Sequence, residues 1–450
     1  MKKCLHVLLA TAIATAALPV CAANLIDVFE RAKQSDPQIL KADADRLGAR
    51  ESKPLALAKL LPQLGLSAGI SKNKTDSLQP FVPLTAPVDY SSDVTEKSYS
   101  LQLNQSIFHW DQWAALKRAD AQVAQAEANY LAQEQDLIVR VAQGYFGVLS
   151  AKDQVDSAQA AVAAFEQELE QTEKRFEVGL IPITDVKEAR AQRDQSVADV
   201  IDAKRQLATA IEQLRAITGA EFDSLAAPTD DMPLKTPDPA SEDKWVSVAM
   251  EQNLGVIAAR MGVDIARQDV NAAEAGHLPS LDLVASYGKK TDDTTYTAAS
   301  GSLDQNTFQK PKSIGLQLTF PIFSGGATQA SVRQKVYAKR SAQESLELAT
   351  RQTERDVRDN YLGVLSDISR VKALKQALES SQVALQATEA GFDVGTRTTV
   401  DVLLSRNKFF QAQTTYLQSR YKYLLSLIQL EQAAGQLNRA DLEEINGWLK

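Results

Sequence analysis

Apolar and polar residues alternate in four short stretches of the chain, and this alternation predicts four β-strands in two pairs. In the first pair the apolar positions are Leu64, Leu66, Ala68 and Ile70, then Tyr99, Leu101 and Leu103. In the second pair they are Leu281, Leu283, Ala285 and Tyr287, then Leu316, Leu318, Phe320 and Ile322. The segments between paired strands, about 71–95 and 289–312, are rich in Ser, Thr, Asp, Lys and Gly, so we expect exposed loops there.

Apolar and small residues at spacings of three and four predict helices over most of the remaining chain. Two long helices are expected at Trp110–Phe176 and Ala327–Phe392, each about 100 Å long at 1.5 Å per residue. Four shorter helices of about 50 Å are expected at Ile183–Thr218, Val400–Ala434, Asn24–Lys59 and Asp243–Gly276. Two short helices end to end match one long helix, which favours a helical wall of uniform height.

The chain carries an internal duplication. VAQGYFGVLS from Val141 matches VRDNYLGVLS from Val357 at 6 of 10 positions, at an offset of 216 residues. The same offset pairs Phe176-Glu177-Val178-Gly179 with Phe392-Asp393-Val394-Gly395. We therefore expect two copies of one unit in the order helix, strand pair, long helix, turn and shorter helix.

The duplication gives the expected domain boundaries. Repeat 1 covers residues 23–219, repeat 2 covers 243–437, and a C-terminal segment covers 438–450. The connecting segment 220–242 contains four prolines, which exclude a continuous helix there. The expected fold class is mainly α with a membrane β part.

The first 22 residues have the pattern of a secretory signal peptide. Lys2 and Lys3 precede an apolar stretch and then small residues, so we expect cleavage after Ala22 or Ala23. A lipoprotein signal is the competing interpretation of Cys21. Both cysteines, Cys4 and Cys21, lie in this segment, so a mature chain without thiols, disulfides or thiolate metal ligands is expected.

Charge and composition exclude several classes of protein. The formal net charge is −8 and no basic block interrupts the chain, so a nucleic-acid partner is not expected. Beyond the signal segment the histidines are His109 and His277, and there is no P-loop or GxGxxG fingerprint. We expect neither an enzyme nor a cofactor or metal site.

The strands suggest a shared membrane barrel. A strand of about ten residues spans a bilayer only within a closed barrel, and four strands cannot close around a pore, so several chains must contribute. Aromatic residues fall where strand passes into helix, as in an interfacial girdle; they are Phe108, Trp110, Trp113, Phe320 and Phe323. A small aromatic core at the junction is the alternative.

Four segments carry a resemblance to the TolC family of outer-membrane efflux and secretion ducts. They are LLPQLGL from Leu60, RFEVGL from Arg175 with ITDV from Ile183, HLPSLDL from His277, and VGTRTTVDVL from Val394. The resemblance implies a homotrimer with a 12-stranded outer-membrane barrel and a periplasmic tunnel of 12 helices. It also implies two partners, a periplasmic adaptor protein and an inner-membrane transporter of the RND, ABC or MFS type.

The resemblance further implies a gate at the turns between long and short helices. The matching positions are Thr184, Asp185 and Arg397 for one link, and Glu168 and Glu389 for another. A tyrosine of the family is replaced here by Phe392, which has no hydroxyl to donate. Glu168 and Glu389 carry like charges, so that link requires a water, a cation or a different partner.

The same resemblance assigns two further features. A cation-selective ring would use Asp401, while a second ring position is occupied by Leu404. The turns would dock the adaptor through Gly179, Leu180, Gly395 and Thr396. A helix N-cap is the alternative role of Asp401, and a periplasmic coiled-coil adaptor or structural protein without a pore is the alternative function.

Overall fold

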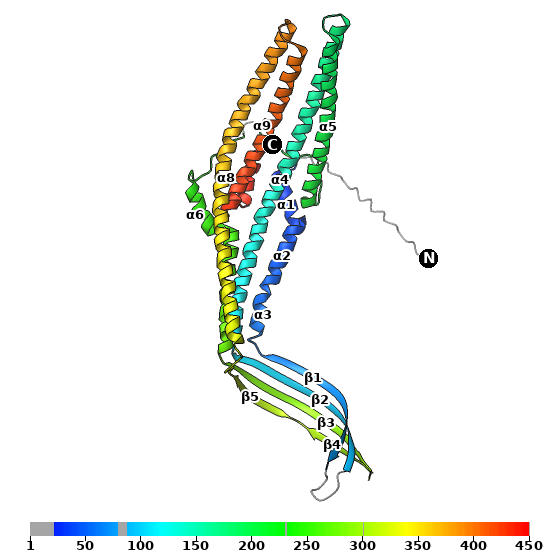
Figure 1. Ribbon diagram of the computed structural model, residues 1–450, viewed down its shortest axis with the longest axis vertical. Helices are drawn as coiled ribbons and strands as arrows, with labels where there is room; N and C mark the ends of the chain where they lie inside the picture. Colours follow the sequence, from blue (N-terminus) through cyan, green and yellow to red (C-terminus); the bar gives the residue numbers. More distant parts are fainter. Residues whose placement is uncertain (1–21, 80–87, 230–231, 300, 450) are drawn as a thin grey trace, which may run out of the picture. The chain divides into compact units, whose positions relative to one another are not determined.

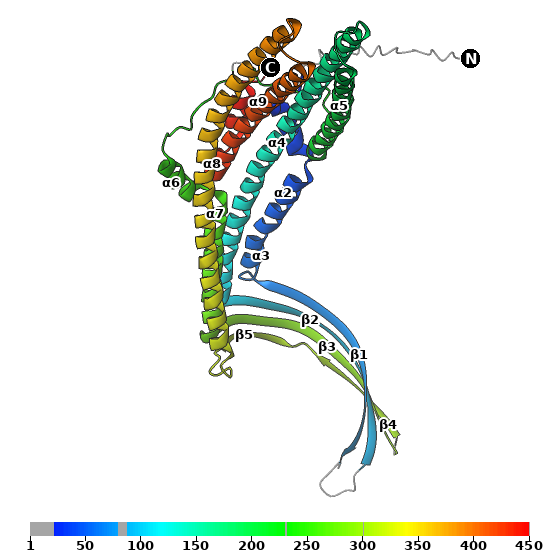
Figure 2. The same cartoon turned by 45° about the horizontal axis from the view of Figure 1, so that its top comes forward.

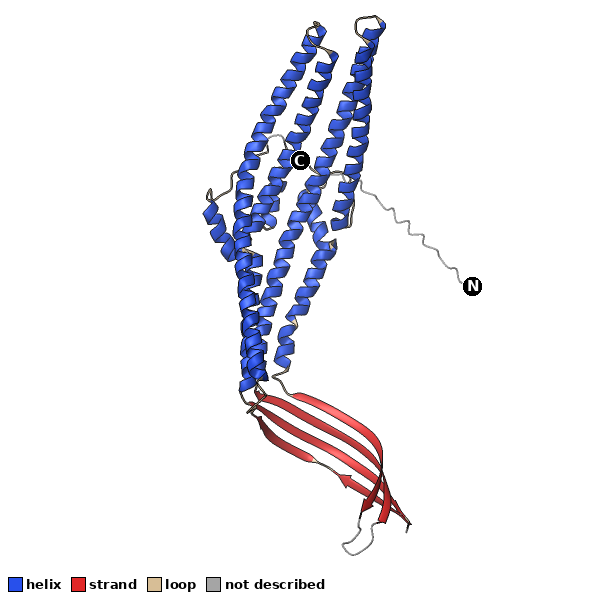
Figure 3. Cartoon of the chain, viewed as in Figure 1, coloured by secondary structure: helices blue, strands red, loops and turns tan. Residues whose placement is uncertain are grey.

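The computed structural model describes residues 22–79, 88–229, 232–299 and 301–449. The signal segment, with Cys4 and Cys21, therefore lies outside the described residues apart from Ala22. The described chain is mostly helical, with all its strands in one sheet (Figure 3). It divides into two compact units: residues 1–40, 133–249 and 355–450 form unit 1, and residues 41–132 and 250–354 form unit 2. Each unit takes segments from both sequence repeats.

The sheet of unit 2 is antiparallel and curved (Figure 2). Its strands are β1 (Gln63–Gln79), β2 (Val88–Phe108), β3 (Ser280–Ala298), β4 (Gly301–Gln309) and β5 (Lys312–Thr319). The order is β1-β2-β3, and the far edge of β3 is shared, with β5 pairing its first half and β4 its second half. Pro311 separates β4 from β5, since proline cannot donate to a strand ladder.

The expectation of exposed loops at 71–95 and 289–312 is wrong for most of their length. β1 continues to Gln79, β2 begins at Val88, and β3 and β4 pair residues 290–298 with 301–309. Polar side chains suggested loops, but Thr and Ser are compatible with strands when both faces of a sheet can be polar. The strands are thus up to 21 residues long rather than about ten.

Both edges of this sheet lack a partner within the described chain. The outer edge of β1 and the outer edges of β4 and β5 pair with no other strand there. The apolar side chains on one face are also exposed, with Leu66 at 74%, Ile314 at 78% and Leu316 at 66%. No described helix carries an apolar stretch of the length and uniformity needed to cross a membrane.

Two long and two shorter helices match the expected ranges closely. They form two helical hairpins, α4 (Trp110–Glu177) with α5 (Ile183–Thr218) and α8 (Ala327–Asp393) with α9 (Thr399–Ala434) (Figure 1). α10 (Arg439–Asn446) follows α9. The segment 220–241 contains no helix in its described part, as its prolines predict.

The two expected single helices at Asn24–Lys59 and Asp243–Gly276 are interrupted. The first is divided into α1 (Leu25–Ser35), α2 (Pro37–Arg50) and α3 (Ser52–Ala58). Pro37 forces Asp36 into an extended conformation, and Pro54 has no N–H to continue the ladder from α2. The second is divided into α6 (Glu242–Gln252) and α7 (Leu254–Glu274), followed by the short 3₁₀ helix η1 (Ala275–His277). Asn253 is extended there, and its side chain caps α7.

The core of unit 1 near the hairpin ends involves α4, α5 and α9. Phe165 is 1% exposed and its ring lies 6.4 Å from that of Phe410. The cluster around it consists of Ala161, Leu169, Val186, Ala189 and Leu403. Small residues on α4 and α5 let the helices approach closely, so the aromatic side chain fills the space between them.

Phe165→Ala is expected to lower the free energy of unfolding by about 3–5 kcal/mol, because it leaves a cavity in this cluster. Chemical denaturation of the detergent-solubilised protein, followed by circular dichroism, measures the change. Leu180→Ala is the matched control, since Leu180 is 73% exposed and should change the stability by less than about 0.5 kcal/mol. Equal denaturation midpoints for the two variants would contradict the assignment of Phe165 to the core.

Candidate functional site

The turns that close the two helical hairpins have the same geometry. Gly179 and Gly395 follow α4 and α8 with φ of 76° and 78°, a conformation that favours glycine. At each turn the glycine N–H donates to a carbonyl three residues earlier, and the next residue donates to a carbonyl five residues earlier. This is the Schellman arrangement. The duplication seen in the sequence is therefore also a duplication of backbone structure at these tips.

The helices that follow these turns begin differently. Thr398 caps α9, and it forms a reciprocal capping box with Asp401, whose Oδ2 accepts from the Thr398 N–H at 3.0 Å and hydroxyl at 2.9 Å. The equivalent cap position of α5 is Pro182, which makes no side-chain cap. Asp185, the counterpart of Asp401, is consequently left without a capping partner.

Asp185 instead links the two hairpins. Its Oδ2 accepts a hydrogen bond from the Thr399 hydroxyl at 3.1 Å, and its Oδ1 accepts one from Thr184 at 3.2 Å. Arg397 is not paired with Asp185 within the described chain; it packs against Gly391, to whose carbonyl its N–H donates at 3.2 Å. Within one chain, the partner of Asp185 in the other hairpin is therefore Thr399, whereas the resemblance suggested Arg397.

Asp401 is held in its own hairpin. The hydrogen bonds from the Thr398 backbone and hydroxyl, with the nearby charge of Arg397, lower the pKa of Asp401 below its usual value. The capping role that the sequence offered as an alternative is therefore present, and it keeps the carboxylate ionised. Leu404, one turn later, is 55% exposed.

A second contact between the hairpins involves Arg175, which the sequence analysis did not single out. Its guanidinium lies 4.3 Å from the centre of the Phe392 ring, and its Nη2 lies 3.2 Å from Asp393 Oδ1. Phe392 has no hydroxyl, but it offers a ring face to a cation. The end of α4 and the end of α8 are thereby connected.

A third contact explains how Glu168 and Glu389 coexist. Arg406 on α9 lies between them, with Nη2 2.5 Å from Glu389 and Nη1 3.4 Å from Glu168. Arg406 also donates to the carbonyl of Ala164 at 2.9 Å. One guanidinium therefore joins α4, α8 and α9. Its positive charge lies between the two glutamates, which carry like charges and need such a partner.

The duplication contains a signal for Arg406 that the sequence analysis missed. At the offset of 216, Glu389 and Arg406 correspond to Glu173 and Arg190. Those two also pair, at 2.7 Å, within the first hairpin. Arg190 is half exposed, whereas the Arg406 side chain is 15% exposed. The repeated Glu–Arg pair thus became a buried junction in one copy alone.

Burial dominates the electrostatics of this junction. It raises the pKa of Glu168 above its usual value, and the positive charge of Arg406 only partly offsets the effect. Glu168 Oε1 has no hydrogen-bond partner in the described chain. Removing Arg406 would therefore leave the buried carboxylate of Glu168 without its cation, beside the partly exposed carboxylate of Glu389.

The remaining expected residues lie on surfaces of the single chain. At the tips, Leu180 is 73% exposed, and the Thr396 hydroxyl donates to the Gly391 carbonyl at 2.9 Å. In unit 2 the aromatic residues at the strand–helix junctions are Phe108, Trp110, Trp113, Phe320 and Phe323, and all of them are exposed. The alternative of a small aromatic core within the chain is therefore wrong.

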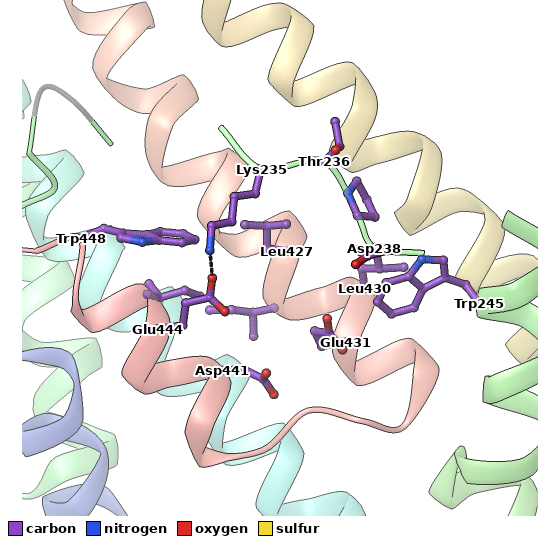
Figure 4. A pocket seen from close by; sticks show the side chains of 13 residues that line it. Lys235, Thr236, Asp238, Trp245, Leu427, Leu430, Glu431, Asp441, Glu444 and Trp448 are labelled. Carbon is purple, nitrogen blue, oxygen red and sulfur yellow. Dashed lines mark hydrogen bonds and ion pairs between the residues drawn. The ribbon is translucent and has the colours of Figure 1, made fainter. Parts of the chain in front are cut away.

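An acid-lined pocket lies elsewhere in unit 1, between α9, α10 and the segment 235–238 (Figure 4). Lys235 pairs with Glu444, and its ammonium lies 5.4 Å from the Trp448 ring centre. The Glu431 carboxyl has no hydrogen-bond donor among the described residues. Burial, then the charges of Asp441 and Glu444, raise the pKa of Glu431 to about 7.

A sheet with exposed apolar side chains and two open edges, joined to helical hairpins that end in paired turns, is the architecture of an outer-membrane channel subunit. Residues 28–220 and 245–436 match the family described as Outer membrane efflux protein. The chain belongs to this family. It is therefore an exit duct of the outer membrane, and the alternative of a pore-less periplasmic protein is not supported.

Individual relatives agree with this assignment. Outer membrane protein TolC of Vibrio cholerae is 37% identical over 450 residues, covering 100% of this chain and 99% of the relative. The alkaline protease secretion protein AprF of Pseudomonas aeruginosa is 29% identical, covering 94% and 86%. The crystal structure of the outer membrane protein VceC from Vibrio cholerae shares the fold, with a TM-score of 0.73 at 20% identity over 91% of this chain and 96% of that one.

The raised pKa of Glu431 predicts a pH dependence of stability. A carboxyl with a higher pKa when folded stabilises the fold most below its unfolded pKa, 4.5, and this contribution is lost as the pH rises through about 7. Glu431→Gln should therefore raise the melting temperature at pH 8 and leave it nearly unchanged at pH 4. Thermal unfolding at both values measures this, with the exposed Glu443→Gln as control. A wild-type pH profile in Glu431→Gln would contradict the assignment.

Proposed function

We propose that three copies of this chain close one 12-stranded barrel that serves as the outer-membrane part of the duct. The observation that carries the proposal is the sheet with two unpaired edges. An open edge exposes backbone N–H and C=O groups, which is untenable in lipid, and pairing β1 of one copy with β4 and β5 of the next would satisfy them. Because β4 and β5 both pair with the same edge of β3, they count as one strand of the barrel, so each chain contributes four strands and a trimer contributes twelve.

The two faces of the sheet support this arrangement. Apolar side chains on one face suit lipid, whereas Gly65, Ser67, Ser100 and Gln102 on the other suit a water-filled lumen. The mass of the protein in detergent tests the proposal. A trimer is expected, and a conducting monomer or dimer would overturn the shared barrel.

In this duct the helical hairpins of unit 1 would form the periplasmic mouth. Repeats 23–219 and 243–437 would each supply one hairpin, and segment 220–242 would connect them. The tips, with Gly179, Leu180, Gly395 and Thr396, would dock a periplasmic adaptor that also holds an inner-membrane transporter. Val178 and Val394 lie beside these residues and are 70% and 75% exposed. An apolar side chain so exposed at each tip supports a protein contact there.

The cargo class follows from the relatives only in outline. One relative is named for protease secretion, one for cation efflux and one for efflux without a stated cargo, which supports efflux, type I protein secretion or both; drugs would be one class of efflux cargo. The transporter would select the cargo, because the contacts between the hairpins would act on the opening of the mouth and do not form an enclosed binding site.

Closure would depend on three contacts between the hairpins: Asp185 with Thr399, Arg175 with Phe392 and Asp393, and Arg406 with Glu168 and Glu389. The expected link between Arg397 and Asp185 would have to join neighbouring copies, because the two side chains do not pair within the described chain. Opening would separate the hairpins, so each contact must break or exchange partners.

Arg406→Gln is expected to increase conductance in planar bilayers, because Glu168 and Glu389 would then repel each other across the junction. Arg190→Gln is the matched control, since Arg190 pairs only within its own hairpin. Its conductance should stay at the wild-type level. Unchanged conductance of Arg406→Gln, or an equal rise in both variants, would show that Arg406 does not hold the mouth shut.

Two variants separate charge from capping at Asp401. Threefold symmetry would repeat Asp401 around the axis, so Asp401→Asn should weaken cation preference while keeping an acceptor for Thr398. Thr398→Ala keeps the carboxylate and loses the cap, at a cost of about 1 kcal/mol in stability. Reversal potentials in a salt gradient measure the preference. The ring assignment fails if Asp401→Asn keeps the wild-type cation preference, or if Thr398→Ala loses as much of that preference as Asp401→Asn does.

A further inference from the structure

The register of the sheet arranges the side chains of its apolar face in successive rows. Leu101 on β2 faces Leu66 on β1 and Tyr287 on β3. One pair farther along, Tyr99 faces Ala68 and Lys289. On β5 the same face carries Leu318, Leu316 and Ile314, and then Lys312, which faces Tyr287. The rows of leucines therefore end at Tyr99 and Tyr287, which we name the aromatic row, and the lysines begin beside these two tyrosines.

The apolar rows between Phe108 and Tyr99 on β2 together have the thickness of a membrane. From Phe108 to Tyr99 is about nine residues, or roughly 30 Å along a strand at 3.3 Å per residue. Strands tilted by about 40° reduce this to roughly 23 Å, close to the apolar band of about 25 Å found in outer-membrane barrels. Tyr99 and Tyr287, 46% and 45% exposed, therefore mark the end of the band away from the helices.

Four lysines follow this aromatic row, and we name them the lysine row: Lys97, Lys289, Lys310 and Lys312. The ammonium of Lys312 lies 5.3 Å from the ring centre of Tyr287, and those of Lys289 and Lys310 lie 4.9 Å and 5.2 Å from that of Phe308. Two of these cations thus share the Phe308 ring, and the third lies over the Tyr287 ring.

Three of these cations are not neutralised by carboxylates of the chain. Within the described residues Lys289, Lys310 and Lys312 form no ion pair, whereas Lys97 pairs with Asp293 at 3.3 Å. An aromatic face attracts a cation but does not cancel its charge. Asp293 lies on the same face as Lys289 but four residues farther along β3, or about 13 Å away along the strand.

We propose that the lysine row binds phosphate-bearing headgroups of net negative charge in the membrane lipid that surrounds the barrel, at the end of the apolar band away from the helices. This inference rests on the proposed duct, because the duct turns this face toward lipid. The position matches the depth at which headgroup phosphates lie, just beyond the aromatic row. The charge also matches, since each cation near an anionic lipid surface strengthens binding roughly fivefold.

The surface beside the row can accommodate such a group. Lys97, Tyr99 and Lys289 line a shallow hollow together with Ile70 and Thr291. Ile70 faces Lys97 and Tyr99 faces Lys289, so apolar side chains and ammonium groups lie side by side in this hollow. A lipid would contact both kinds of side chain, through its acyl chain and its phosphate, whereas a free phosphate ion would contact only the ammonium groups.

The test compares bound lipids on the full-length protein in detergent by native mass spectrometry, with phosphatidylglycerol and phosphatidylcholine of equal chain length as probes. Wild type should prefer phosphatidylglycerol, and Lys289→Gln/Lys310→Gln/Lys312→Gln should lose at least tenfold of that preference. Lys289→Arg/Lys310→Arg/Lys312→Arg should retain it. The matched control, Lys204→Gln/Lys372→Gln/Lys375→Gln, makes the same charge change on helices of unit 1 and should also retain it.

The proposal is overturned if the Gln variant keeps the wild-type preference, or if the helix control loses as much. It is also overturned if excess inorganic phosphate displaces the lipid completely, since the ligand would then be a free anion. Conductance of wild type in phosphatidylcholine bilayers separately tests the duct. A conducting wild type with unchanged preference in the Gln variant would refute the lipid site alone, whereas a non-conducting wild type would refute the duct on which it rests.

Discussion

The unpaired backbone at the two edges of the sheet is the constraint on which the rest of this protein depends. Each edge exposes a row of N–H and C=O groups, and one face exposes a set of large apolar side chains. A single chain can neither pair these backbone groups nor cover this apolar face, because four strands across the sheet are too few to close into a barrel. In the proposed trimer, neighbouring copies would supply the missing pairing, so the membrane part of the duct would be a property of the assembly.

The tips of the helices show how a duplication acquires different roles in its two copies. The backbone of both turns is the same, down to the glycine conformation and the hydrogen bonds around it. The copies diverge at the cap position, where Pro182 stands in place of a capping threonine. Asp401 is therefore held by its own helix, whereas Asp185 is free to reach Thr399 in the other hairpin.

The junction at Arg406 has a different energetic character from the surface ion pairs of the helices. Exposed pairs contribute little, because water screens them and ordering two long side chains costs entropy. Arg406 and Glu168 are largely buried, so their separation would leave uncompensated charge in a poor solvent for ions. Such a contact is stable while the helices stay together, and in the proposed duct it would oppose even a partial separation of the hairpins.

The sequence by itself determined the helices, the strand cores, the duplication and the family, because these follow from local periodicity and from similarity along the chain. Pro37 and Pro54 also carried the signal for the breaks in the first predicted helix, although the periodic pattern concealed it. The tertiary structure alone decided which side chains meet across the hairpins. Arg175 and Arg406 look like ordinary helix-surface cations in the sequence, and only the packing of α4, α8 and α9 brings them to Asp393, Glu168 and Glu389. The physical reason is that periodicity reports which face of an element is buried, whereas the partner of a charge depends on the position of helices that are distant in the chain.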